Sequence, residues 1–90
     1  MRTAARRDDN EEPIVLALQS VGCSVWRLSA KGIPDLLVGR ARQTFLFEVK
    51  GPKGVLTPAQ VKFRRLWKGT PPITVRSITE ALVAVGAIAR

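Results

Sequence analysis

Residues 32–50 read Gly-Ile-Pro-Asp-Leu-Leu-Val-Gly-Arg-Ala-Arg-Gln-Thr-Phe-Leu-Phe-Glu-Val-Lys. Two runs in this stretch are typical of strands, because they are rich in branched and aromatic side chains. Charged residues stand within them: Asp35 opens the first run, and Glu48 and Lys50 interrupt the second. Because strand side chains alternate between faces, Glu48 and Lys50 share one face while the two phenylalanines take the other.

The two predicted strands are joined by only four residues, 40–43, which favours an antiparallel pair. Such a pair brings Asp35, at the start of the first strand, near Glu48, at the end of the second. Two facing carboxylates repel unless a cation lies between them. Mg²⁺ binds through one or two carboxylates and completes its octahedron with water and phosphate oxygens. The stretch therefore predicts a site for a hard divalent cation.

The order of these residues also carries a resemblance to a known family. Pro34-Asp35 followed by Glu48-Val49-Lys50 resembles the PD-(D/E)XK nuclease motif. The longer string, continued by Leu-Thr-Pro-Ala-Gln at residues 56–60, resembles the minimal stand-alone phage and bacterial members of the VRR-NUC (virus-type replication-repair nuclease) family. The similarity runs over nearly the whole chain, residues 8–84.

The resemblance implies a function and a division of roles. It implies an endonuclease that depends on Mg²⁺ or Mn²⁺ and hydrolyses phosphodiester bonds in DNA, selecting branched forms such as Holliday junctions or flaps in phage or bacterial replication and repair. Asp35 and Glu48 would hold the metal together with the Val49 carbonyl. Lys50 would orient or help to deprotonate the attacking water, and Gln60 would reach toward the active site.

Two residues have competing interpretations. Family members place a metal-site glutamate in the first helix, but the aligned position here is Pro13, and Glu12 stands one residue earlier. Glu12 is therefore either a metal residue or an acid favoured near a helix start. Gln60 is either the active-site glutamine or the third helical residue of a capping box with Thr57.

Composition restricts the classes of site. The 90 residues carry a net charge of +8, contain Cys23 as the single cysteine and include no histidine. A disulfide framework and an imidazole-based zinc site are thereby excluded. From Pro13 onward the only acids are Asp35, Glu48 and Glu80, so the carboxylate pair stands in a positive field that attracts nucleic acid. The plainer alternative is basicity that serves solubility alone.

The rest of the chain alternates capped helices with short strands. Residues 1–9 are predicted to be a flexible basic arm, and residues 10–90 a single domain. A helix is predicted from Asn10 or Asp9, as N-cap, to about Val21, and Ser77 and Glu80 form the capping box of a final helix. The expected fold is α/β with a restriction-endonuclease-like core, in which helices flank a mixed four-stranded sheet in the order α-β-β-β-α-β-α.

DNA contacts are expected from two groups of cations. Lys31 and Lys53 lie in glycine-containing loops beside the predicted site. The helix that begins at Pro58 has one apolar stripe that should pack (Ala59, Phe63, Leu66, Trp67), and four cations outside it (Lys62, Arg64, Arg65, Lys68). These four either contact phosphates or form an ordinary solvated face. Trp26 is expected to be partly buried rather than a platform for base stacking.

Other functions and the assembly state follow from the same residues. The alternative to a nuclease is a non-catalytic nucleic-acid-binding module on the same fold, and a third reading is a structural subunit of a phage or repair assembly. A homodimer is expected, because Trp26 and the C-terminal Val83, Val85, Ala87 and Ile88 exceed what a small core can bury. Without a targeting or membrane-spanning segment, the expected location is the cytoplasm of a bacterium or phage-infected host.

Overall fold

The computed structural model describes residues 8–89, so most of the predicted basic arm lies outside the described residues. The elements follow the predicted order: α1 (Glu11–Ser20), β1 (Ser24–Arg27), β2 (Leu36–Arg40), β3 (Gln43–Val49), α2 (Pro58–Leu66), β4 (Ile73–Val75) and α3 (Ile78–Ala84). No helix within this described range has the length and apolar character needed to span a membrane. The α/β class and the mixed four-stranded sheet are confirmed.

The sheet is ordered β1-β2-β3-β4. Its first three strands are antiparallel to their neighbours, and β4 runs parallel to β3. The β2–β3 turn consists of Ala41 and Arg42, both with positive φ, of 51° and 66°. This is the conformation of the hairpin turns that match strand twist. The resulting register pairs Leu36 with Phe47, which puts Asp35 level with Glu48.

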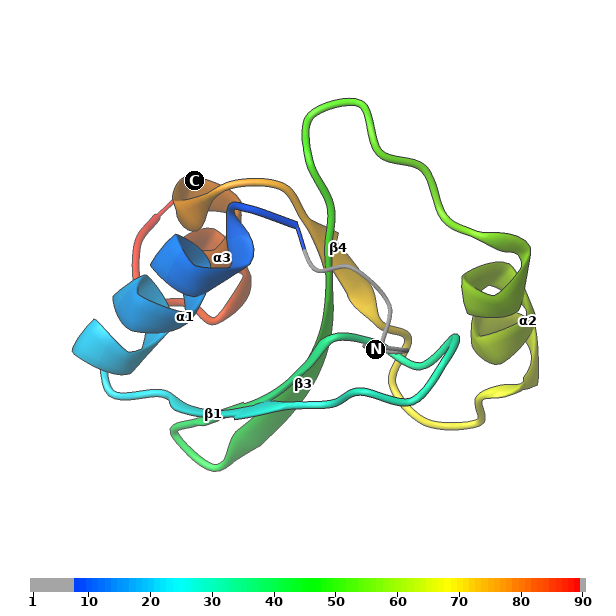
Figure 1. The fold of residues 1–90 in the computed structure, drawn as a ribbon. Helices are drawn as coiled ribbons and strands as arrows, with labels where there is room; N and C mark the ends of the chain where they lie inside the picture. The colour runs from blue at the N-terminus through cyan, green and yellow to red at the C-terminus, as the bar shows by residue number, and fades with distance from the viewer. Residues whose placement is uncertain (1–7, 90) are drawn as a thin grey trace.

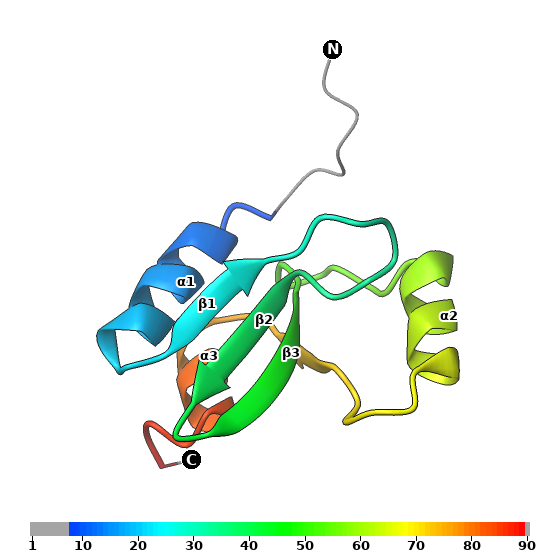
Figure 2. The same ribbon diagram turned by 90° about the horizontal axis from the view of Figure 1, so that it is seen from below.

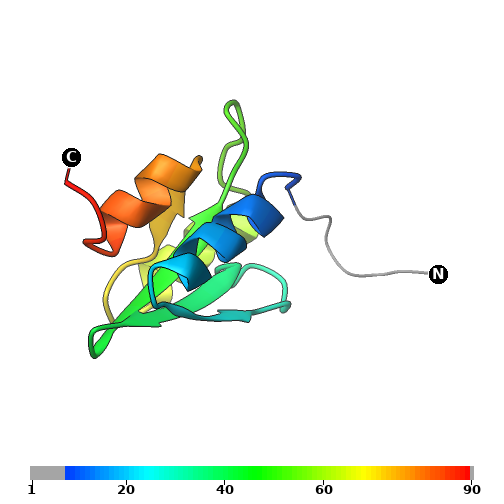
Figure 3. The ribbon, with the colours of Figure 1, turned by 90° about the vertical axis from the view of Figure 1, so that its left-hand side faces the viewer.

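The core lies between one face of the sheet and a layer formed by α1 and α3, which pack side by side (Figures 1 and 3). Fully buried side chains from α1 and the sheet meet there (Ile14, Leu18, Leu36, Val38, Phe47, Val75). The alternation predicted for β3 is confirmed, because Phe47 points into this core whereas Glu48 belongs to the opposite face. One face of the sheet thus supplies stability and the other carries the acids.

Two polar side chains tie the layers together. The Arg40 guanidinium donates to the carbonyls of Val21 and Val85, at 3.0 and 3.2 Å, and so binds the C-terminal ends of both α1 and α3. Asn10 does not use its side chain as the N-cap of α1. Its amide donates instead to the carbonyls of Lys50 and Arg76, 3.1 Å each, and joins the chain just beyond β3 to that beyond β4.

Helix α2 stands apart from the α1–α3 layer (Figures 1 and 2). None of its residues is fully buried. Of the predicted apolar stripe, Ala59 and Phe63 are half-buried, whereas Leu66 and Trp67 are exposed, so the prediction that the stripe packs within the chain is wrong for its C-terminal half. Trp26 is 71% exposed and is not the partly buried residue that was expected. Conversely, Val85 is part of the core rather than surplus apolar surface. Exposed apolar side chains of α2 and of the outer face of the sheet thus form part of the unburied apolar surface.

Candidate metal and active site

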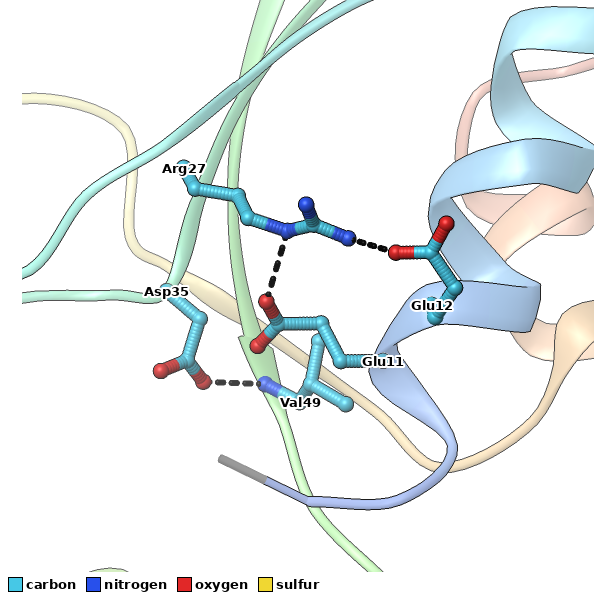
Figure 4. Close-up of polar contacts among 5 residues, drawn as sticks. All are labelled: Glu11, Glu12, Arg27, Asp35 and Val49. Atoms are coloured by element: carbon cyan, nitrogen blue, oxygen red, sulfur yellow. Dashed lines mark hydrogen bonds and ion pairs between the residues drawn. The ribbon is translucent and has the colours of Figure 1, made fainter. Parts of the chain in front are cut away.

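Backbone hydrogen bonds hold Asp35 at the start of β2. Its N–H donates to the Phe47 carbonyl at 2.9 Å, and its own carbonyl accepts from the Leu28 N–H at 2.8 Å. The Asp35 carboxylate turns across the end of β3, where Oδ2 accepts from the Val49 N–H at 2.8 Å (Figure 4). The side chain is thereby aimed at the end of the strand that carries Glu48.

Glu48 is only 2% exposed, although it lies on the face of the sheet that α1 and α3 do not cover. Its carboxyl group lies beside that of Asp35, which is the proximity that the sequence predicted for the ends of these two strands. Burial, followed by the hydrogen bond and the charge of Asp35, raises the pKa of Glu48 from 4.5 to about 8, against the opposing charges of Lys50 and Arg64. Burial and the neighbouring acid therefore both favour the protonated form of Glu48.

Gln60 satisfies both of its predicted roles with one side chain. Its Oε1 accepts from the Thr57 N–H at 2.8 Å, while Thr57 Oγ1 accepts from the Gln60 N–H at 3.2 Å, which completes the capping box. Its Nε2 donates to Glu48 Oε2 at 2.9 Å. The amide has separate oxygen and nitrogen ends, so capping the helix leaves the nitrogen end for the site.

The donor set fits a hard divalent cation. Two neighbouring carboxyl groups can bind one ion together, and a divalent charge would oppose the burial and the Asp35 charge that raise the pKa of Glu48. Among residues 8–89, no three histidine, cysteine or acidic side chains are grouped so as to hold a metal ion. The chain thus supplies two carboxylates, which leaves positions for backbone carbonyl, water and phosphate oxygens.

The first helix brings Glu11, rather than Glu12, to the inner side of this region. Glu11 is 3% exposed and its carboxylate points toward Asp35 and Val49 (Figure 4). Glu12 has a side chain that is 62% exposed. Arg27 donates to both acids, with Nε 3.1 Å from Glu11 Oε2 and Nη2 in contact with Glu12. Glu11 precedes Ile14 by three residues and Leu18 by seven, so helical periodicity alone places it on the buried face.

The basic residues predicted for the site differ in how they relate to the carboxylates. Lys50 follows β3 directly, and its charge acts on Glu48. Lys31 is exposed in the loop before Asp35, and that loop touches α2, because a Cβ added at Gly32 would lie 3.1 Å from the Cβ of Ala59. Lys53, Lys62, Arg65 and Lys68 are also exposed. Their contact with DNA stays a prediction.

Arg64 differs from its three basic neighbours on α2. Its guanidinium turns toward the sheet, where Nη2 donates to Thr74 Oγ1 at 2.9 Å. Its charge lowers the pKa of Glu48, and its Nε is buried. Arg64 was predicted to lie among the cations outside the apolar stripe, but it follows Gln60 by four residues and therefore shares the site-facing side of the helix.

Comparison with known proteins adds no identification. No protein-family model, no curated protein and no solved structure matches the chain.

Proposed function

We propose that this chain is a metal-dependent DNA endonuclease of the VRR-NUC type, on a restriction-endonuclease-like core. Its substrate would be the phosphodiester bonds of branched DNA in the cytoplasm of a bacterium or a phage-infected host. The observation that carries the proposal is the approach of the Asp35 and Glu48 carboxyl groups, each held by its own hydrogen bond, in a chain of net charge +8. An acidic pair is unfavourable for binding phosphates unless a cation joins it.

The residues of the site have complementary tasks in hydrolysis. When bound, Mg²⁺ or Mn²⁺ would supply positive charge that stabilises the pentacovalent phosphorus transition state. Asp35 and Glu48 would hold it, with the Val49 carbonyl as a further oxygen ligand. The Val49 N–H fixes Asp35, and Gln60 fixes Glu48, so both carboxylates are oriented before any ligand arrives.

Lys50 would position the attacking water. In the reaction, the water oxygen forms a bond to phosphorus, the bond from phosphorus to one bridging sugar oxygen breaks, and that oxygen takes up a proton. The water loses a proton in the same process, and Lys50, which directly follows the strand that carries Glu48, would assist that loss. The exposed cations Lys31, Lys53 and Lys62 would hold the flanking phosphates.

Cleavage of a panel of linear, flapped and four-way DNAs with Mg²⁺, Mn²⁺ or EDTA tests the proposal. The parent should cut with either metal and not with EDTA. Asp35→Asn should reduce the rate by at least about 100-fold, since it removes a metal-ligand charge. Its affinity for DNA, measured by fluorescence anisotropy in Ca²⁺, should change little, since the basic surface remains.

Asp9→Asn is the matched control, because it makes the same chemical change at an exposed position outside the sheet that carries the carboxylate pair. It should cut like the parent. Binding of DNA without cleavage by the parent in either metal would favour the non-catalytic binding module instead.

A further inference from the structure

Two polar links join α2 to the sheet, and they lie side by side. Gln60 reaches Glu48 on β3, and Arg64, one helical turn later, reaches Thr74 on β4. Glu48 and Thr74 are partners in the β3–β4 register, so the two links reach adjacent positions on the outer face of the sheet. Arg64 is thereby brought next to the carboxylate pair rather than into solvent.

The guanidinium of Arg64 is incompletely paired. Arginine has five N–H donors, and among the described residues the guanidinium makes a single hydrogen bond, to Thr74. Its Nε is buried and has no hydrogen-bond partner within residues 8–89. Nor does it form a salt bridge with Glu48, since the ion pairs between described residues are those of Arg27. A buried donor without a partner calls for an explanation, and a partner from outside the chain provides one.

The chemistry of that partner follows from its neighbours. A guanidinium beside two carboxyl groups that suit a divalent cation forms, together with that cation, a positively charged receptor for an anion. The planar fork of arginine matches phosphate oxygens in pairs. A guanidinium held in place near the reacting group also stabilises charge that develops in a transition state without further reorganisation.

We propose that Arg64 is a catalytic residue whose guanidinium, docked on Thr74, binds a non-bridging oxygen of the phosphodiester at the Asp35–Glu48 pair. The proposal rests on the nuclease function proposed above. The proposal gives Arg64 and its exposed neighbour Arg65 different roles. Arg65 would contact only the flanking phosphates. Arg64 would act on the reacting phosphate, and Arg65 on affinity alone.

The adjacent pair of arginines provides a matched experiment. Arg64→Gln and Arg65→Gln remove the same charge from neighbouring positions of one helix. At saturating enzyme and a single turnover, Arg64→Gln should lower the cleavage rate by about 100- to 1000-fold, the range for loss of one transition-state donor. Arg65→Gln should leave that rate within about threefold and instead weaken DNA binding, with a salt-dependence slope smaller by about 0.9. Arg64→Lys, which keeps the charge, should recover part of the rate.

Readouts besides activity separate chemistry from structure. The melting temperature and Mn²⁺ affinity of the Arg64 variants should stay near the parent values. Affinity for thymidine 3′,5′-bisphosphate in Ca²⁺ should fall at least tenfold in Arg64→Gln and not in Arg65→Gln. If Arg64→Gln does not fold, the same comparisons apply to Arg64→Lys and to Thr74→Val, which removes only the docking hydroxyl and should lower the rate by about three- to tenfold.

The outcomes distinguish the two proposals. Equal single-turnover rates for the two glutamine variants in an active parent would overturn the role of Arg64 and leave the nuclease proposal intact. A rate loss that follows a lower melting temperature would make Arg64 structural and overturn the inference. Absence of cleavage by the parent would refute the nuclease proposal. If bisphosphate affinity still depended on Arg64, only the phosphate-binding role of Arg64 would stand.

Discussion

Glu48 links the chemistry of the site to the stability of the fold. Its pKa in the folded chain is raised from 4.5 to about 8, so between these values the folded state binds a proton that the unfolded state has lost. Stability then decreases as pH rises, because the state that binds more protons is favoured at lower pH. The contribution is complete below about pH 4.5 and is lost as pH passes through about 8.

The first prediction is a pH dependence that Glu48 controls. In EDTA, the free energy of unfolding of the parent should fall between pH 5 and 8.5, with a slope of at most about 1.4 kcal/mol per pH unit. Glu48→Gln removes the titration and should flatten the profile. Urea unfolding at a series of pH values measures the free energy of unfolding of both proteins. Burial raises the pKa of Cys23, so the folded thiol keeps its proton over this range. The same slope in both proteins would assign the effect to other groups.

Gln60 shows how one side chain can serve a helix and a site, and the two roles can be separated experimentally. Thr57→Ala removes the cap hydroxyl and should cost about 1 kcal/mol of stability, while the Gln60–Glu48 contact persists and cleavage changes little. Gln60→Ala should lower stability by a similar amount. It should also lower the cleavage rate by about 10- to 100-fold, because Glu48 loses the hydrogen bond that orients it as a metal ligand. Urea unfolding and single-turnover cleavage report the two effects. Equal rates in the two variants would reduce Gln60 to a capping residue.

Arg40 joins elements that are distant in sequence. It donates to the last turns of both α1 and α3, whose carbonyls otherwise lack helical partners. Arg40→Gln should therefore lower the free energy of unfolding by about 1–3 kcal/mol, as for lost hydrogen bonds of a charged donor. Arg42→Gln, an equal charge change in the exposed hairpin turn, is the control and should stay within about 0.5 kcal/mol of the parent.

The exposed apolar surface bears on assembly. Leu66 and Trp67 of α2 are exposed, and so are Leu37 and Trp26, which pair across β1 and β2 on the face that carries Glu48. A small chain rarely leaves such residues uncovered without a partner surface. We therefore expect a homodimer that covers α2 and the outer face of the sheet, and places its sites about a two-fold axis.

Sedimentation at micromolar concentration tests this expectation. The parent should sediment as a dimer of the 9.9 kDa chain. Leu66→Glu should give monomers, because it introduces a charge into the apolar surface of α2. Leu16→Glu, the same change at an exposed residue of α1, should stay dimeric. A 9.9 kDa parent monomer that cuts both strands of a branched DNA would show that assembly is not required.

Local patterns in the sequence determined the elements and the identity of the carboxylate pair. The period of two in residues 43–49 separated Phe47 from Glu48, and the Thr57-Pro58 start and the Ser77 cap located α2 and α3. Helix capping and side-chain alternation depend on only a few neighbouring residues, so both can be predicted from the sequence alone. The same reasoning located Asp35 and Glu48 together, because a short hairpin link leaves little choice of register.

Only the tertiary structure decided which side chains those elements bring together. Glu11 rather than Glu12 lies inside, Arg64 turns toward Thr74, and Asn10 bridges two chain ends instead of capping its helix. Each successive residue turns a helical side chain by about 100°, so its direction matters only once the helix has a partner. The exposure of α2 likewise depends on where the helix lies, and packing between distant segments determines that position.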